Sequence, residues 1–162
     1  MSRFVKSLIL FLSIIVILSN IAFAGGLSTT LTEVKIEGAK PDVIYSIKEQ
    51  AGKPLIVKNT TETRSVDIAI EAEKPVDYNL VPGYEPIPDL SWVVIEKNYF
   101  ENVMPGESAE TDIMIKIPDD EKYSEKKYQV YIYSHTAGKD MMRMGLMSRI
   151  LIETAKFPPK EK

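Results

Sequence analysis

The sequence predicts an all-β protein, an antiparallel β-sandwich of about seven to nine short strands. Two observations predict this fold. Apolar and polar residues alternate along most of the chain, and Pro or Gly residues separate the alternating runs. A period of two places one face of each segment toward a core, and Pro and Gly mark turns. After residue 24, no segment of ten or more residues has the period of an amphipathic helix.

The alternating runs give the expected strands in chain order: 31–37, 43–48, 53–62, 65–75, 107–120, 126–135 and 147–154. Each run is rich in the β-branched and aromatic residues that favour strands. The residues expected to face the core are Val34, Ile36, Leu55, Val57, Val66, Ile68, Ile70, Ile113, Ile115, Ile117, Tyr128, Val130 and Ile132. Between strands, residues 119–127 are expected to form at most one short helical turn.

Residues 1–24 are predicted to be a secretory signal peptide. Arg3 and Lys6 form a basic start, residues 8–18 are almost entirely apolar, and Ala22-Phe23-Ala24 matches a cleavage signal. The alternative is an uncleaved anchor, because the segment reaches the roughly 20 residues that span a bilayer. We expect cleavage, and therefore a periplasmic, secreted or cell-surface protein with no stable membrane span. The rest divides into one domain, 25–155, and a charged, Pro-containing tail, 156–162.

Composition excludes several kinds of function. The chain has no cysteine, so thiol catalysis, thiolate metal sites and thiol redox sensing are excluded. It has 20 Lys and Arg against 23 Asp and Glu, a net charge of −3 at pH 7, with both signs interspersed. Nucleic-acid binding needs a basic stripe, and the sequence has none, so no nucleic-acid partner is expected.

Residues 118–133 indicate an immunoglobulin-like sandwich. In such folds a tyrosine begins the strand after the E–F corner, two residues before a core position. Here Tyr128 precedes Val130 by two residues, where an antibody domain has its second cysteine. Tyr123 is the competing candidate for this role. Trp92, the only tryptophan, is then expected to pack between the sheets.

Residues 54–154 resemble the immunoglobulin-like accessory domains of prokaryotic surface and periplasmic proteins. These include the PapD-like amino-terminal domain of pilus chaperones and related domains of peptidoglycan-binding WxL-type surface proteins. The shared pattern comprises an apolar-x-apolar-x-Asn strand at 55–59, a Pro-Gly-Glu-Ser turn at 105–108, an Ile-rich strand ending in Pro-Asp, and a Tyr-led strand. The resemblance implies the fold. It does not imply chaperone activity, because the basic pair that anchors a pilin carboxyl terminus cannot be placed here.

Aromatic residues and one loop supply the predicted contacts with a partner. Tyr131, Tyr133 and His135 alternate with the core positions of their strand and are expected to form an outward stripe. The further predicted contacts are Tyr84 and Trp92 in the Pro-rich segment 78–92, and Met141, Met142 and Met144 in the loop before the last strand. Exposed aromatic patches often mark recognition surfaces. The alternative is that segment 78–92 only caps one end of the sandwich.

A soft-metal site is the rival interpretation of the methionine-rich loop. Thioether sulfur favours Cu(I), and His135, Met141, Met144 and Met147 are the candidate ligands. Methionine also fills irregular apolar space, and Arg143 inside the loop is a poor neighbour for a cation. Packing is therefore the favoured role of these methionines.

No residue pattern predicts catalysis. The acidic pairs 119–120 and 71/73 lie in expected turns and edges, and Asn59-Thr60-Thr61 is either a glycosylation acceptor or, as favoured, a strand-end turn. We therefore expect a non-enzymatic module without a cofactor. It would bind a protein or a surface polymer in the cell envelope, by strand addition to a sheet edge or by stacking on sugar rings.

Overall fold

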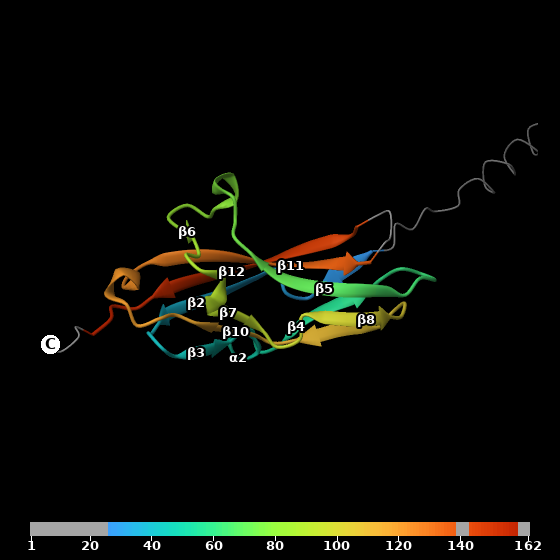
Figure 1. Cartoon of the computed structure of the whole chain (residues 1–162), viewed down its shortest axis with the longest axis horizontal. Coiled ribbons are helices and arrows are strands. Elements are labelled where there is room, and N and C mark those ends of the chain that lie inside the picture. Colours follow the sequence, from blue (N-terminus) through green and yellow to red (C-terminus); the bar gives the residue numbers. More distant parts are fainter. Residues whose placement is uncertain (1–25, 139–142, 159–162) are drawn as a thin grey trace, which may run out of the picture.

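The computed structural model describes residues 26–138 and 143–158, which form the predicted all-β sandwich (Figure 1). One layer is a sheet in the order β2-β12-β11-β5-β8, and β6 pairs with β11 beside it. Its strands are β2 (Glu33–Ala39), β5 (Val66–Glu73), β6 (Glu85–Pro86), β8 (Tyr99–Val103), β11 (Lys127–Ala137) and β12 (Gly145–Thr154). The pairings of β2 with β12 and of β6 with β11 are parallel, and the others in this sheet are antiparallel.

The second layer consists of two three-stranded sheets, ordered β1-β4-β9 and β3-β10-β7. Their strands are β1 (Leu27–Thr29), β3 (Ile44–Ser46), β4 (Leu55–Asn59), β7 (Val93–Ile95), β9 (Ser108–Thr111) and β10 (Ile113–Lys116). The helical segments are short: α2 (Ile47–Ala51) and the 3₁₀ turns η1 (Asp77–Asn79), η2 (Leu90–Trp92) and η3 (Glu121–Tyr123). The turn η3 is the one expected within residues 119–127.

The described residues form twelve strands, more than predicted, partly because Asp112 divides one expected run. Its carboxylate accepts hydrogen bonds from the Lys48 amide at 2.9 Å and from the Ser46 hydroxyl at 2.5 Å. Ser46 in turn caps α2 by accepting from the Glu49 amide at 3.2 Å. The helix therefore interrupts the predicted strand 43–48, and the facing strand bends at Asp112 into β9 and β10.

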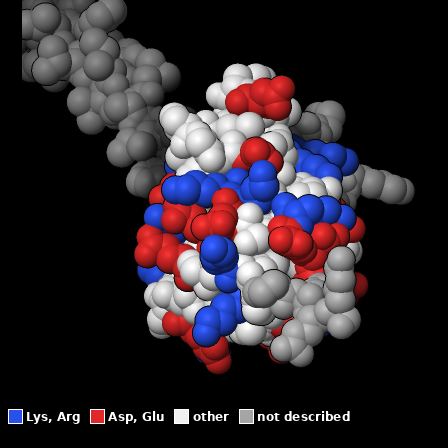
Figure 2. Space-filling view, turned by 90° about the vertical axis from the view of Figure 1, so that its left-hand side faces the viewer, with Lys and Arg blue, Asp and Glu red and all other residues white. Residues whose placement is uncertain are grey.

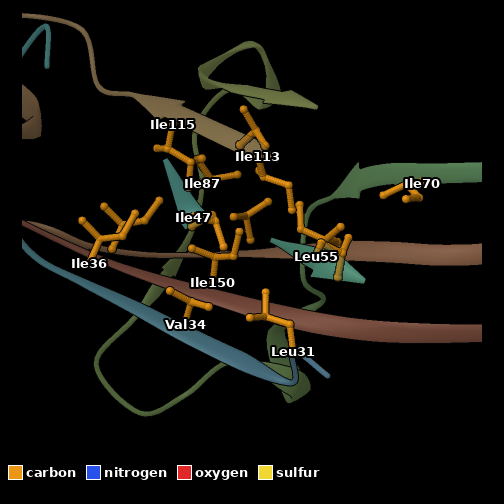
Figure 3. Close-up of a cluster of buried hydrophobic side chains, with 14 of the residues drawn as sticks. Leu31, Val34, Ile36, Ile47, Leu55, Ile70, Ile87, Ile113, Ile115 and Ile150 are labelled. Atoms are coloured by element: carbon orange, nitrogen blue, oxygen red, sulfur yellow. The ribbon is translucent and has the colours of Figure 1, made fainter. Parts of the chain in front are cut away.

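The core between the layers is rich in isoleucine (Figure 3). Every residue that the alternation placed inside is buried, which confirms the predicted strand faces. Each fully buried Ile or Leu side chain stabilises the fold by about 1.5–3 kcal/mol relative to an exposed one.

The domain extends beyond residue 155, where the predicted tail begins. Phe157 is only 6% exposed and belongs to the core cluster, and its amide donates to the Ser124 hydroxyl at 2.9 Å. The Ala155 amide donates to the Ala39 carbonyl at 2.9 Å. The tail prediction is thus corrected for its first residues, because an aromatic ring there completes the core.

The predicted signal peptide lies outside the described residues. Within residues 26–138 and 143–158, no helix has the length and apolar character needed to cross a membrane.

Both signs of charge are mixed over the surface. On the end of the molecule turned to the viewer in Figure 2, Lys and Arg side chains lie among Asp and Glu side chains rather than in one basic area. This view agrees with the mixed charge pattern of the sequence.

Candidate binding surface

The outward face of β11 carries the predicted stripe. Val130 and Ile132 are fully buried, whereas Tyr131, Tyr133 and His135 are half-buried on the opposite face. The rings of Tyr133 and His135 stack with their centroids 4.8 Å apart and an interplanar angle of 25°. The stripe is therefore a packed surface and not a row of free side chains.

Neighbouring strands hold these two rings in place. The Tyr133 ring lies over Gly145 of β12, where a Cβ would come within 2.5 Å of the ring. A glycine at this position leaves room for the ring to lie against the backbone. On the other side, His135 Nε2 lies 3.7 Å from a carboxylate oxygen of Glu71 on β5.

The segment 74–92, which we call the crossover segment, leaves β5 and covers part of the same face. Gln129 occupies an outward position of β11, yet it is completely buried. Its side-chain amide donates to the Asn79 carbonyl at 3.0 Å and accepts from the Val81 amide at 2.9 Å. The Tyr131 hydroxyl also donates to the Asn79 carbonyl, at 3.1 Å. The crossover segment is thus fixed to the sheet by directed hydrogen bonds.

Tyr84 anchors the crossover segment at a second point. Its hydroxyl donates to a Glu153 carboxylate oxygen at 2.7 Å, and the same oxygen accepts from Lys127 at 2.9 Å and lies 3.1 Å from the Lys35 ammonium. Hydrogen bonds from these three groups lower the pKa of Glu153 to about 2. Burial, followed by the hydrogen bond to Glu153, raises the pKa of Tyr84 to about 12.

Trp92 does not lie on this surface. It is 5% exposed and packs edge-to-face against Tyr123 and Tyr128, with centroid distances of 4.6 and 5.7 Å. Its packing between the sheets follows the sequence prediction. Trp92 therefore does not contribute a contact on the outward face of β11, because the two tyrosines cover most of its indole.

The tip of the crossover segment carries a residue that sequence reasoning missed. Tyr78, in η1, is 87% exposed, and Val76 beside it is 48% exposed. Figure 1 shows this green loop standing away from the sandwich above the sheet. One feature of the sequence could have predicted its exposure. Tyr78 lies between polar Asp77 and Asn79, outside any alternating run that would bury it.

The structure separates Met144 from the two other described candidates for the soft-metal site, His135 and Met147. Met147 lies opposite Tyr133 on the same outward face as His135, whereas Met144 packs against the core cluster on the other side of the sheet. Met141 and Met142 lie outside the described residues. Within the part of the chain that the structure describes, no group of three or more His, Asp or Glu residues could hold a metal ion.

Comparisons with known proteins identify the fold. No protein-family model matches this chain, and no curated protein matches it by sequence. A solved Bacteroides ovatus protein, provisionally described as carbohydrate binding, aligns with a TM-score of 0.57 and 12% identity over 80% of this chain. This chain spans only 37% of that structure. PapD-like domain 7 of human CEP192 aligns with a TM-score of 0.51 and 8% identity, covering 81% of this chain and 86% of that domain.

The fold is a PapD-like, immunoglobulin-like sandwich. This confirms the fold that the sequence resemblance implied. The periplasmic chaperone SfaE is a more distant match, with a TM-score of 0.46 and 13% identity over 83% of this chain and 61% of its own. At these identities the comparisons establish architecture, and the functional assignment depends on the surface itself.

Proposed function

We propose that this domain is an exported, non-enzymatic binding module of the cell envelope. It would hold a protein or a surface polymer through the tip of the crossover segment and the adjoining outward face of β11. The observation that carries this proposal is Tyr78, an aromatic side chain left 87% exposed at a projecting tip. Large aromatic side chains exposed in this way favour recognition, because they bury much area when a partner binds.

The anchoring of the crossover segment supports the proposal. A loop that is ordered before binding loses less conformational freedom when its partner arrives. The Asn79 carbonyl, next to Tyr78 in the chain, accepts hydrogen bonds from both Gln129 and Tyr131. Glu153 holds Tyr84 further along the segment. Tyr78 is therefore presented from a fixed base.

The stripe extends the contact surface at the foot of this loop. Tyr131 connects the two parts, since it belongs to β11 and bonds to the crossover segment. A protein partner would place an apolar pocket over Tyr78, whereas a polymer would stack a sugar ring on it. Either kind of partner would contact Tyr78, so the same variants test the surface for both. Recovery of a soluble protein or of an insoluble polymer then identifies the class of partner.

The test compares partner recovery by the wild-type chain with recovery by Tyr78→Ser and by the double variant Tyr131→Ser, Tyr133→Ser. Each is immobilised and exposed either to solubilised envelope proteins or to insoluble envelope polymer. We expect Tyr78→Ser to lower recovery about tenfold or more, the scale of a central aromatic contact. Its thermal unfolding should not change, because the side chain makes little contact with the fold.

Met104→Ser is the control, because Met104 is an apolar side chain, 49% exposed, that follows β8 in the turn toward β9 and lies outside the proposed surface. It should leave recovery unchanged. Equal recovery by Tyr78→Ser and wild type, with either class of partner, would refute the proposed surface.

A further inference from the structure

The second layer has an apolar concavity on its solvent side, away from the crossover tip. It measures about 300 Å³ and is lined by Ile44, Ser91, Trp92, Val94, Met114 and Lys116. Ile44 is 61% exposed and Val94 52% exposed. The apolar walls come from all three strands of the β3-β10-β7 sheet and from the turn η2.

These residues occupy positions that alternation normally makes polar. Met114 and Val94 are paired across β10 and β7. The neighbours of Met114 in the chain, Ile113 and Ile115, are both fully buried on the opposite face. A solvent-facing sheet surface usually carries polar side chains. Apolar residues on the outward face of all three strands therefore indicate a surface that another molecule covers.

An acidic hollow adjoins the apolar one. It is lined by Asp42, Asp89, Ser91, Trp92, Lys116 and Pro118, and so shares Ser91, Trp92 and Lys116 with the first. Lys116 lies 3.0 Å from Asp42 and pairs with it. Asp89 leaves one net negative charge among the lining residues, and outside them the Lys74 ammonium also acts on it. A bound molecule that fills both hollows needs an apolar group beside a cationic one.

The size and place of the concavity favour a peptide over a second copy of this chain. A stable dimer buries about 800 Å² on each partner, far more than one small hollow offers. The end strand β7 is Val93-Val94-Ile95 and has none of the Lys or Pro residues that usually protect an edge. A strand laid beside β7 would turn every second side chain toward the face of Val94.

We propose that this concavity binds an extended segment of a partner protein in which an apolar residue and a Lys or Arg are separated by one residue. The apolar side chain lies over Val94 and extends toward Met114 on the neighbouring strand. The cation meets Asp89 in the adjoining hollow. This concavity is separate from the binding surface proposed above, so an experiment can refute one proposal and leave the other standing.

The test uses NMR of the chain labelled at Ile, Val and Met methyl groups, titrated with the peptide acetyl-Thr-Leu-Thr-Lys-Thr-amide. Versions with Ile or Phe in place of Leu extend the series, and a version with Glu in place of Lys tests the charge. We expect saturable shifts at the Met114 and Val94 methyls by about millimolar concentration, the affinity range of a short peptide. The Glu version should bind about three- to tenfold more weakly.

Two variants locate the site. Asp89→Asn keeps an oxygen to accept the 2.8 Å hydrogen bond from the Ser91 amide while removing the charge, and should weaken the Lys peptide about threefold but not the Glu peptide. Val94→Thr keeps the β-branched shape and should weaken both. Met104→Thr, at a position 49% exposed on another turn, should change nothing.

The proposal is overturned if none of the three apolar peptides shifts these methyls at about 5 mM, or if Asp89→Asn and Val94→Thr bind like wild type. Shifts that grow with protein concentration alone would assign the face to self-association and also overturn it.

Discussion

Replacing Asn59 should destabilise the fold by several kcal/mol. The side chain is completely buried at the end of β4. Its amide donates to the carbonyls of Arg64 and Val103, each at 2.9 Å, and its oxygen accepts from the amide and the hydroxyl of Thr61 at 2.9 and 2.7 Å. This confirms the strand-end turn predicted for Asn59-Thr60-Thr61. It also shows that both amide hydrogens are engaged, so a glycan there would require the turn to open.

The magnitude follows from the groups that lose a partner. In Asn59→Ala, the buried carbonyl of Val103 is left unsatisfied, at about 1–3 kcal/mol, and the loss at the more exposed turn adds about 1 kcal/mol. We expect a loss of about 2–4 kcal/mol in the free energy of unfolding. For a domain of this size that loss lowers the urea midpoint by about 1–2 M without changing the slope.

Asn59→Asp sharpens the test, because it preserves size and the acceptor for Thr61. A carboxylate cannot donate, and it faces two carbonyl oxygens, so this variant should be at least as unstable as Asn59→Ala at pH 7. Asn98→Ala, at an exposed asparagine, should lie within about 0.5 kcal/mol of wild type. A loss below about 1 kcal/mol for Asn59→Ala, or an Asp variant as stable as wild type, would refute the hydrogen-bond account.

Further predictions test other contacts. Glu153→Gln should lower the melting temperature at neutral pH. The difference from wild type should vanish as pH falls from 4.5 toward about 2, because the folded state holds the Glu153 pKa near 2 and acid then protonates this carboxylate in both states. A difference in melting temperature that persists unchanged below pH 2 would contradict this prediction. Gly145→Ala places a methyl group within 2.5 Å of the Tyr133 ring, so the His135 ring signals should shift in NMR while the protein stays folded. Phe157→Ala should lower the free energy of unfolding, measured in urea, by about 3 kcal/mol, because it removes a ring from the core cluster.

The strands could be predicted because burial in a sheet has a local sequence signal. A period of two over 113–117 or 128–132 decides which side chains face inward whatever the partner strand is. The interruption at Asp112 had no such signal. It depends on a carboxylate reaching residues 46 and 48, far away in the chain, and alternation carries no information about that contact.

The outward face was harder to predict for a related reason. Alternation placed Gln129, Tyr131 and Tyr133 on one face correctly, but exposure on that face depends on what crosses it. The crossover segment buries Gln129 completely, half-covers Tyr131 and leaves Tyr78 in solvent. The position of Trp92 in a Pro-rich loop predicts a contact residue, but the loop turns back toward the core at η2 to begin β7 and leaves the indole only 5% exposed.

The same reasoning about strand faces explains why the apolar side chains of Met114 and Val94 point to a bound partner. Ile113 and Ile115 must face the core, so Met114 between them has to face outward, and sheet pairing places Val94 beside it. An apolar side chain at such a position does nothing for the core and leaves apolar area in water, which costs about 25 cal/mol for each Å² exposed. A change of either residue to Thr or Ser should therefore cost the isolated domain little stability. If both positions tolerate that change in isolation, their apolar character is best explained by a bound partner and not by folding.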